Sequence, residues 1–174
     1  MKYMQTTYET CLTCSLLLGV NRVIPIEINK DLEIECLLHS LRFSKDDFVT
    51  GHLDFIVKKF NVKITRLVDN KRFYSFIKKR WSLPNVDLLV NRIDLKVIDK
   101  LIKKKPIVYI DSYYLFKDYH FPHFITILDK SRKGYKIFDT WDGKEKFIGS
   151  KVLSRSISSL RNHLKICPQL LVVE

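Results

Sequence analysis

Cysteine is scarce in this chain of 174 residues, which has only Cys11, Cys14, Cys36 and Cys167. Four scattered thiols are too few for the disulfide framework of a small secreted protein. No apolar run approaches the roughly 18 residues of a membrane-spanning helix. Stretches rich in proline, glycine or serine are also missing, so no linker divides the chain. Because 46% of the residues are hydrophobic, we expect one domain over residues 1–174, with one substantial core.

The beginning of the chain has some features of a secretion signal, because Lys2 precedes the apolar stretch 12–20. Polar residues and Glu9 separate the two, and no small-residue cleavage site follows. We therefore expect a soluble, cytoplasmic protein without membrane insertion. The sequence leaves its oligomeric state unknown.

Acidic residues are outnumbered, 19 against 31 lysines and arginines, and the net charge is +12. The excess is concentrated in residues 58–105, where fifteen basic residues accompany four acidic ones. Such a region attracts polyanions or acidic partners, although solvated helix faces have the same composition. Interleaved aromatic residues such as Phe73 and Trp81 suit a core as well as base stacking. A basic nucleic-acid-binding domain without catalysis is therefore one alternative function.

Helical patterns dominate the first part of the chain. Thr10 is placed to cap a helix over residues 12–18 that ends at Gly19. Asn29 begins a second helix, and a capping box at residues 44–47 begins a third that reaches residue 60. A short strand is expected over residues 62–68, then a helix from residue 69 or 70 to 81 and another from Asp94 that ends before Pro106. The expected inner face of the second helix is formed by Ile34, Leu37, Leu38 and Leu41.

From residue 107 onward the pattern changes to the two-residue period of strands. Strands are expected over residues 107–111, 123–129 and 135–139, with a turn at residues 131–134 between the last two. A helix over residues 149–160 and a final edge strand over 165–173, interrupted by Pro168, complete the chain. The order predicts an α+β fold, with a helical lobe at about 1–105 and an antiparallel sheet lobe at about 106–174.

Cys11 stands where a thiol is most easily activated. At the start of the first helix, the helix dipole and free backbone N–H groups stabilise a thiolate. Cys14, one turn further on, is expected to point into the core, where free cysteine is ordinarily a small hydrophobic residue. Gln5 lies just upstream, and its amide can join the Cys11 backbone N–H in binding an oxyanion.

His123 and Asp139 are the candidate partners of this thiol. One begins a strand and the other ends a neighbouring strand, and a strand spacing of about 4.8 Å allows an imidazole–carboxylate hydrogen bond. His120 is a weaker alternative because it lies outside the strand register. Asp142 is weaker because Asp142-Gly143 is a turn signal.

This order of residues resembles the papain-like cysteine peptidases of the bacteriocin-leader (double-glycine) type, over nearly the whole chain. It consists of Gln5, Cys11 after five intervening residues, a strand that begins with His123 and a strand that ends in Asp139. The resemblance implies a papain-like fold, with Cys11 as nucleophile, His123 as general base, Asp139 as its orienter and Gln5 as oxyanion donor. Thr10, Leu12 and Thr140 depart from the residues that the family usually has. The chain resembles the free-standing members, and no cofactor or metal is implied.

The expected reaction is cleavage of a peptide or amide bond through an acyl-thioester. The substrate is expected to be a peptide or protein, and the charge favours an acidic one. Tyr113, Tyr114 and Trp141 are candidates to line the cleft. An acyltransferase or transglutaminase-like enzyme would use the same triad and pass the acyl group to an amine.

Two further roles for the cysteines are weaker. Cys11 and Cys14 have the spacing of a thioredoxin-type redox pair, but that motif follows a strand in a βαβ unit. Cys36 and His39 are one pair of potential zinc ligands, and a zinc site needs two more.

Overall fold

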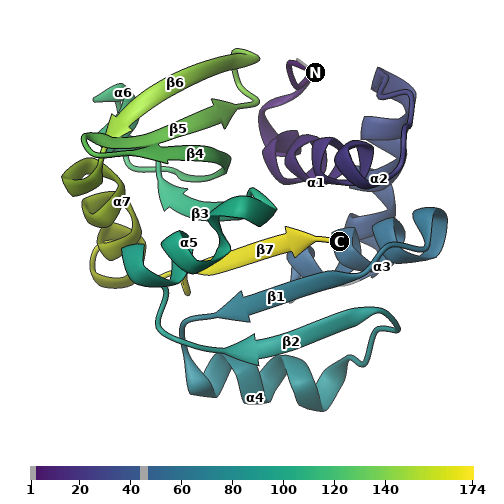
Figure 1. Ribbon diagram of the computed structural model, residues 1–174. Coiled ribbons are helices and arrows are strands. Elements are labelled where there is room, and N and C mark those ends of the chain that lie inside the picture. The colour runs from purple at the N-terminus through teal and green to yellow at the C-terminus, as the bar shows by residue number, and fades with distance from the viewer. Residues whose placement is uncertain (1–2, 44–46) are drawn as a thin grey trace.

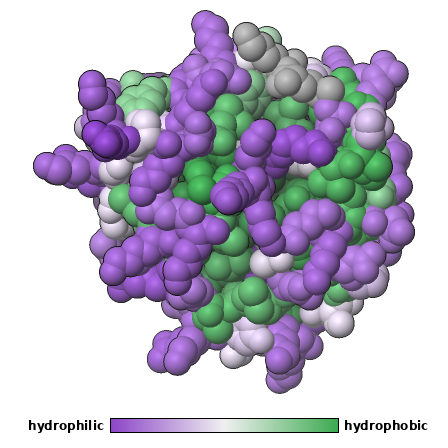
Figure 2. Space-filling model, in the orientation of Figure 1, coloured by the Kyte–Doolittle hydropathy of each residue, from purple (hydrophilic) through white to green (hydrophobic). Residues whose placement is uncertain are grey.

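A single seven-stranded sheet, in the order β2-β1-β7-β3-β4-β5-β6, runs through the described part of the protein. The computed structural model describes residues 3–43 and 47–174. Helices cover both faces of the sheet (Figure 1). All its strand pairs except β1 with β2 are antiparallel, so the α+β class predicted from the sequence is confirmed. Hydrophilic side chains cover most of the face in Figure 2, and smaller hydrophobic areas lie between them. Within the described residues, none of the helices has the length and apolarity needed to span a bilayer.

The helix that carries Cys11, α1 (Cys11–Val23), is buried on all sides from Cys11 to Val20. Its apolar surface predicts this central place. The predicted end at Gly19 is wrong, because the helix continues for four more residues. Gly19 instead permits a close approach to β7 (Gln169–Val173), since a Cβ atom there would lie 2.7 Å from the Val173 side chain.

The second helix, α2 (Lys30–Phe43), is capped as predicted, because Asn29 accepts a hydrogen bond from a backbone N–H of its first turn. Its predicted inner face is wrong, since Leu38 and Leu41 are 44% and 55% exposed. The helix turns its small residues toward α3 (Phe48–Phe60) instead. At Gly51 of α3, a Cβ atom would lie 2.7 Å from the Ser40 backbone, so the two helices pack too closely for leucine at their contact. The predicted capping box before α3 lies largely outside the described residues.

Residues 61–105 contribute strands as well as helices. The predicted strand is present as β1 (Ile64–Val68), and α4 (Lys71–Arg80) follows, capped by Asn70. A strand that the sequence did not predict, β2 (Val86–Val90), pairs parallel to β1 at the edge of the sheet. The first lobe is therefore not purely helical, and the sheet is not wholly antiparallel. The strand β2 was missed because it is short and mostly exposed, without an alternating pattern.

The remaining elements begin with α5 (Leu95–Leu101), capped by Asp94 as predicted. A short 3₁₀ turn (Ile102–Lys104) leads to the predicted strands β3 (Ile107–Asp111), β4 (Pro122–Ser131) and β5 (Gly134–Asp139). A small helix α6 (Tyr113–Phe116) and the edge strand β6 (Lys144–Gly149) were not predicted. The helix α7 (Ser150–Asn162) then precedes β7.

The last strand, β7, was predicted at an edge and lies instead between β1 and β3. All five of its residues are buried. Pro168 comes just before the strand, so its missing N–H costs no ladder hydrogen bond. With β7 in the centre, one core forms between the sheet and α1 and α3, and a second between the sheet, α5 and α7 (Figure 1).

Candidate active site

The segment that leads into α1 is tied to the end of β5 (Figure 1). The Gln5 backbone N–H donates to the Thr140 carbonyl at 2.9 Å, and the Thr140 hydroxyl donates to Gln5 Oε1 at 2.7 Å. These two bonds join residues 135 positions apart and bring the start of α1 to the strand end where Asp139 lies.

A buried carboxylate, Glu33 on α2, holds the same segment from the other side. It accepts hydrogen bonds from the Tyr3 hydroxyl at 2.7 Å, from the Thr6 backbone N–H at 2.8 Å and from the Thr10 hydroxyl. Because the Thr10 hydroxyl is used in this way, it does not cap α1, contrary to the sequence expectation. The Thr10 side chain therefore leaves the start of α1 uncapped, and the helix dipole there favours negative charge at Cys11.

His123 and Asp139 are both fully buried, and His123 Nε2 lies 2.9 Å from Asp139 Oδ1. The register between β4 and β5 sets Thr126 opposite Phe138, which puts Asp139 on the diagonal from His123. Diagonal neighbours on one face of an antiparallel pair are within reach of long side chains. The structure therefore brings together the histidine and the aspartate that the sequence selected.

Cys11 is the third member of this group. Its thiol lies close enough to His123 to raise the pKa of the imidazole, as Asp139 also does. Burial is the larger single effect and lowers this pKa, but the two partners together outweigh it and set the value at about 9. His123 Nδ1 is buried and makes no hydrogen bond with any described residue. It is therefore the ring atom that is free to take the Cys11 proton.

Asp139 is held in its charged form. Burial opposes ionisation, but hydrogen bonds from His123 and Lys146 and one from the Trp141 backbone outweigh it and lower the pKa to about 2. The Lys146 ammonium lies 2.7 Å from Asp139 Oδ2, and the Trp141 N–H donates to Oδ1 at 3.0 Å. At neutral pH Asp139 is therefore a carboxylate, bonded to the His123 ring. Lys146 was missed because the strand β6 that carries it was missed.

Replacing Lys146 with methionine should raise the pKa of His123 further, by up to about one pH unit, because Asp139 then offers the imidazolium an unshared negative charge. The measurement is an NMR titration of the His123 ring. The rate of Cys11 alkylation, followed against pH, should show its alkaline transition shifted in the same direction. Lys144→Met on the same strand is the matched control and should leave both unchanged. A lower pKa in the Lys146 variant would contradict this account.

The other three cysteines are poor candidates for a reactive thiol. Burial and the neighbouring Glu33 raise the pKa of Cys14 far above its usual range. Burial raises the pKa of Cys36 to about 12 and also raises that of Cys167. All four thiols are free, and α1 follows a 3₁₀ turn rather than a strand. These features disfavour a redox pair at Cys11 and Cys14.

Gln5 lies beside the site, with its side-chain amide engaged. Its two N–H bonds donate to the carbonyl of Thr7 at 2.8 Å and to that of Tyr8 at 3.2 Å. An oxyanion would have to take over the longer of these bonds, the one to Tyr8. The oxyanion role of Gln5 therefore stays a prediction, and the bonds shown here give Gln5 a second role, in shaping the loop before Cys11.

The competing histidines are occupied elsewhere. His120 Nδ1 lies 2.6 Å from Asp111 Oδ2, and its ring stacks on Tyr113. His39 lies 2.8 Å from Asp54, while Cys36 is fully buried. In the parts of the chain that the structure describes, no three potential metal ligands come together.

Aromatic rings lie around the buried His123 ring. Trp141 stacks on the His123 ring at 4.0 Å between centroids, and Tyr8 lies 4.9 Å from Trp141. Phe116 is 6.3 Å from His123. Of the three aromatic residues expected in the cleft, only Trp141 contacts this histidine, because Tyr113 and Tyr114 surround His120. An open pocket of about 270 Å³ adjoins the site, lined by Gln5, Thr6, Thr7, Tyr8 and Trp141.

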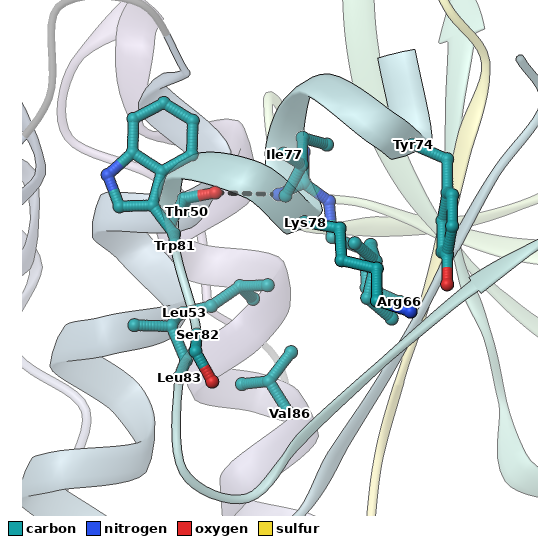
Figure 3. A pocket seen from close by; sticks show the side chains of 11 residues that line it. Thr50, Leu53, Arg66, Tyr74, Ile77, Lys78, Trp81, Ser82, Leu83 and Val86 are labelled. Atoms are coloured by element: carbon teal, nitrogen blue, oxygen red, sulfur yellow. Dashed lines mark hydrogen bonds between the residues drawn. The ribbon is translucent and has the colours of Figure 1, made fainter. Parts of the chain in front are cut away.

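A pocket of about 310 Å³ between α3, α4 and β2 is a weaker candidate (Figure 3). The charged group on its wall, Arg66, is 1% exposed. Its five N–H bonds are all used by Asp47, Thr50 and Gln169. Arg66 has no donor left for a ligand, and it instead joins α3 to β1 and β7.

No protein-family model matches this chain, and neither does any curated protein sequence. The assignment of a function therefore rests on the geometry around Cys11, His123 and Asp139.

Proposed function

We propose that this protein is a papain-like cysteine peptidase or amidohydrolase with Cys11, His123 and Asp139 as its catalytic triad. The observation that carries the proposal is the environment of His123. One ring nitrogen is bonded to Asp139, the other is buried and unpaired, and the thiol at the start of α1 is close enough to shift the pKa of the ring.

The reaction begins when the Cys11 proton moves to His123 Nδ1. The thiolate attacks the substrate carbonyl carbon, and the oxyanion that forms is stabilised by the Cys11 backbone N–H at the uncapped start of α1, with Gln5 as a second donor. His123 then protonates the leaving amine, and a thioester with Cys11 remains. Water, deprotonated by His123, hydrolyses the thioester and restores the thiol. Acyl transfer would follow if an amine replaced this water.

Iodoacetamide at near-neutral pH should modify Cys11 well before the other three cysteines, because His123 supports its thiolate while burial suppresses the others. Peptide mass spectrometry of briefly labelled native protein measures the order. Urea-unfolded protein is the control, in which all four should react at similar rates. Earlier labelling of Cys14, or a Cys11–Cys14 disulfide in native protein, would support the redox role instead.

The activity itself is tested with a peptide library, read by mass spectrometry, and with Cys11→Ala as the blank. New carboxyl termini that need Cys11 would establish hydrolysis, and products joined to an added amine would establish acyl transfer. A reactive Cys11 with neither product would overturn the proposed peptidase activity.

A further inference from the structure

A second feature of the molecule is a large open groove of about 930 Å³ between α4 and the segment that leads into β7. Its charged lining consists of Arg72, Arg92, Arg161 and Lys165 with a single carboxylate, Asp69. Arg72 and Arg92 come from the basic stretch 58–105, and Arg161 and Lys165 come from outside it.

Three of these cations are available to a ligand. Arg161 is already paired with Asp69, with N–O distances of 2.6 and 3.0 Å. Arg72, Arg92 and Lys165 are exposed and form no ion pair with any described residue. Because the one acid in the groove is neutralised by Arg161, the field of the other three is uncompensated, and it attracts negatively charged partners.

The aromatic residues of the groove decide between two kinds of acidic partner. Single-stranded nucleic acid needs exposed ring faces on which bases can stack. The Phe73 and Phe76 rings are nearly parallel, with an interplanar angle of 11°, and their centroids lie 6.4 Å apart. The Arg66 guanidinium lies 5.9 Å from the Phe73 ring, and the Arg80 guanidinium lies 4.4 Å from the Phe76 ring. An arginine therefore already lies over each ring. This leaves less ring face for stacking bases, so the groove favours a carboxylate-rich peptide.

The groove and the candidate active site open at the same end of the sheet. Ladder pairing aligns the start of β4, where His123 lies, with the end of β3. The start of β7, at Gln169, is aligned with the end of β1 next to Asp69. Two to three strand spacings separate β4 from β7 and β1, which is about 10–14 Å. An extended peptide spans that distance with about three to four residues.

We propose that this groove binds an acidic stretch of the peptide substrate, about three to four residues or more from the bond that Cys11 attacks. This inference rests on the proposed function for its link to cleavage. Binding in the groove can be measured without cleavage, so the two can fail separately.

The test measures fluorescence anisotropy of a labelled hexaglutamate peptide with the full Cys11→Ala chain. Arg72→Glu/Arg92→Glu is the test variant, and it should weaken binding at least about tenfold. Arg72 stands in the first turn of α4, where an acid is favoured, so the fold should be kept. The control variant is Lys133→Glu/Lys151→Glu, which makes the same change of charge at exposed sites outside the groove. As in the test variant, one of the two residues lies in the first turn of a helix. The control should bind hexaglutamate nearly as tightly as the wild type. Rising salt should weaken binding by the wild-type groove.

An oligothymidylate of equal charge is the competitor. Tighter binding of the oligonucleotide through the same two arginines would overturn the proposal in favour of nucleic acid. Equal loss in both double variants, or no binding of hexaglutamate at low salt, would also overturn it. Iodoacetamide labelling of Cys11 in the Arg72→Glu/Arg92→Glu chain, with its cysteine intact, should be unchanged, so failure of the groove leaves the active-site proposal standing.

Discussion

Cys11→Ala, His123→Ala and the double variant should all lower kcat/KM to one similar residual level, at least about 10³-fold below wild type. The three share a level because the thiol and the imidazole act as a unit, and removing either removes the thiolate attack. Initial rates on the best peptide from the library measure the effect. Gln5→Ala should cost about 10²- to 10³-fold in turnover if its amide joins the oxyanion site.

The matched control is His120→Ala, which removes a histidine paired with Asp111 rather than Asp139. It should keep most of the activity. Thermal unfolding of each variant must stay near wild type for the comparison to hold. A greater loss of activity in the His120 variant than in the His123 variant would show that the wrong histidine has been assigned.

Arg66→Met should lower the free energy of unfolding by about 3–5 kcal/mol, because it removes the Arg66 guanidinium from the buried Asp47 carboxylate. Asp47 is 5% exposed, and its Oδ2 lies 2.9 Å from the arginine. Urea unfolding measures the change. Arg72→Met, at an exposed arginine, is the control and should change stability by less than about 0.5 kcal/mol.

The double variant Arg66→Met/Asp47→Leu separates the charge from the packing. It should recover much of the lost stability, since a buried pair replaced by apolar groups is often neutral. If the double variant were less stable than Arg66→Met, the loss would come from packing around β1 and β7 rather than from the broken Asp47–Arg66 ion pair.

Much of the candidate site follows from local patterns. Cys11 at a helix start, His123 near the start of a strand and Asp139 at a strand end all depend on periodicity and on a turn signal between adjacent strands. Such features involve neighbours in the chain, and the structure places all three residues as expected. Lys146 and Glu33 could not be found in this way, because each acts on a residue that only a long-range contact brings near.

The sequence by itself determined the α+β class, most of the helix starts and the three residues that meet around His123. Only the tertiary structure decided that β7 is central, that β2 and β6 form the edges and that Leu38 and Leu41 point outward. These choices depend on which elements pack together, and a five-residue exposed strand or a leucine-rich helix face has no local pattern that reveals its partner. The basic groove was decided in the same way, since its cations come from segments up to 93 positions apart that meet only at the end of the sheet.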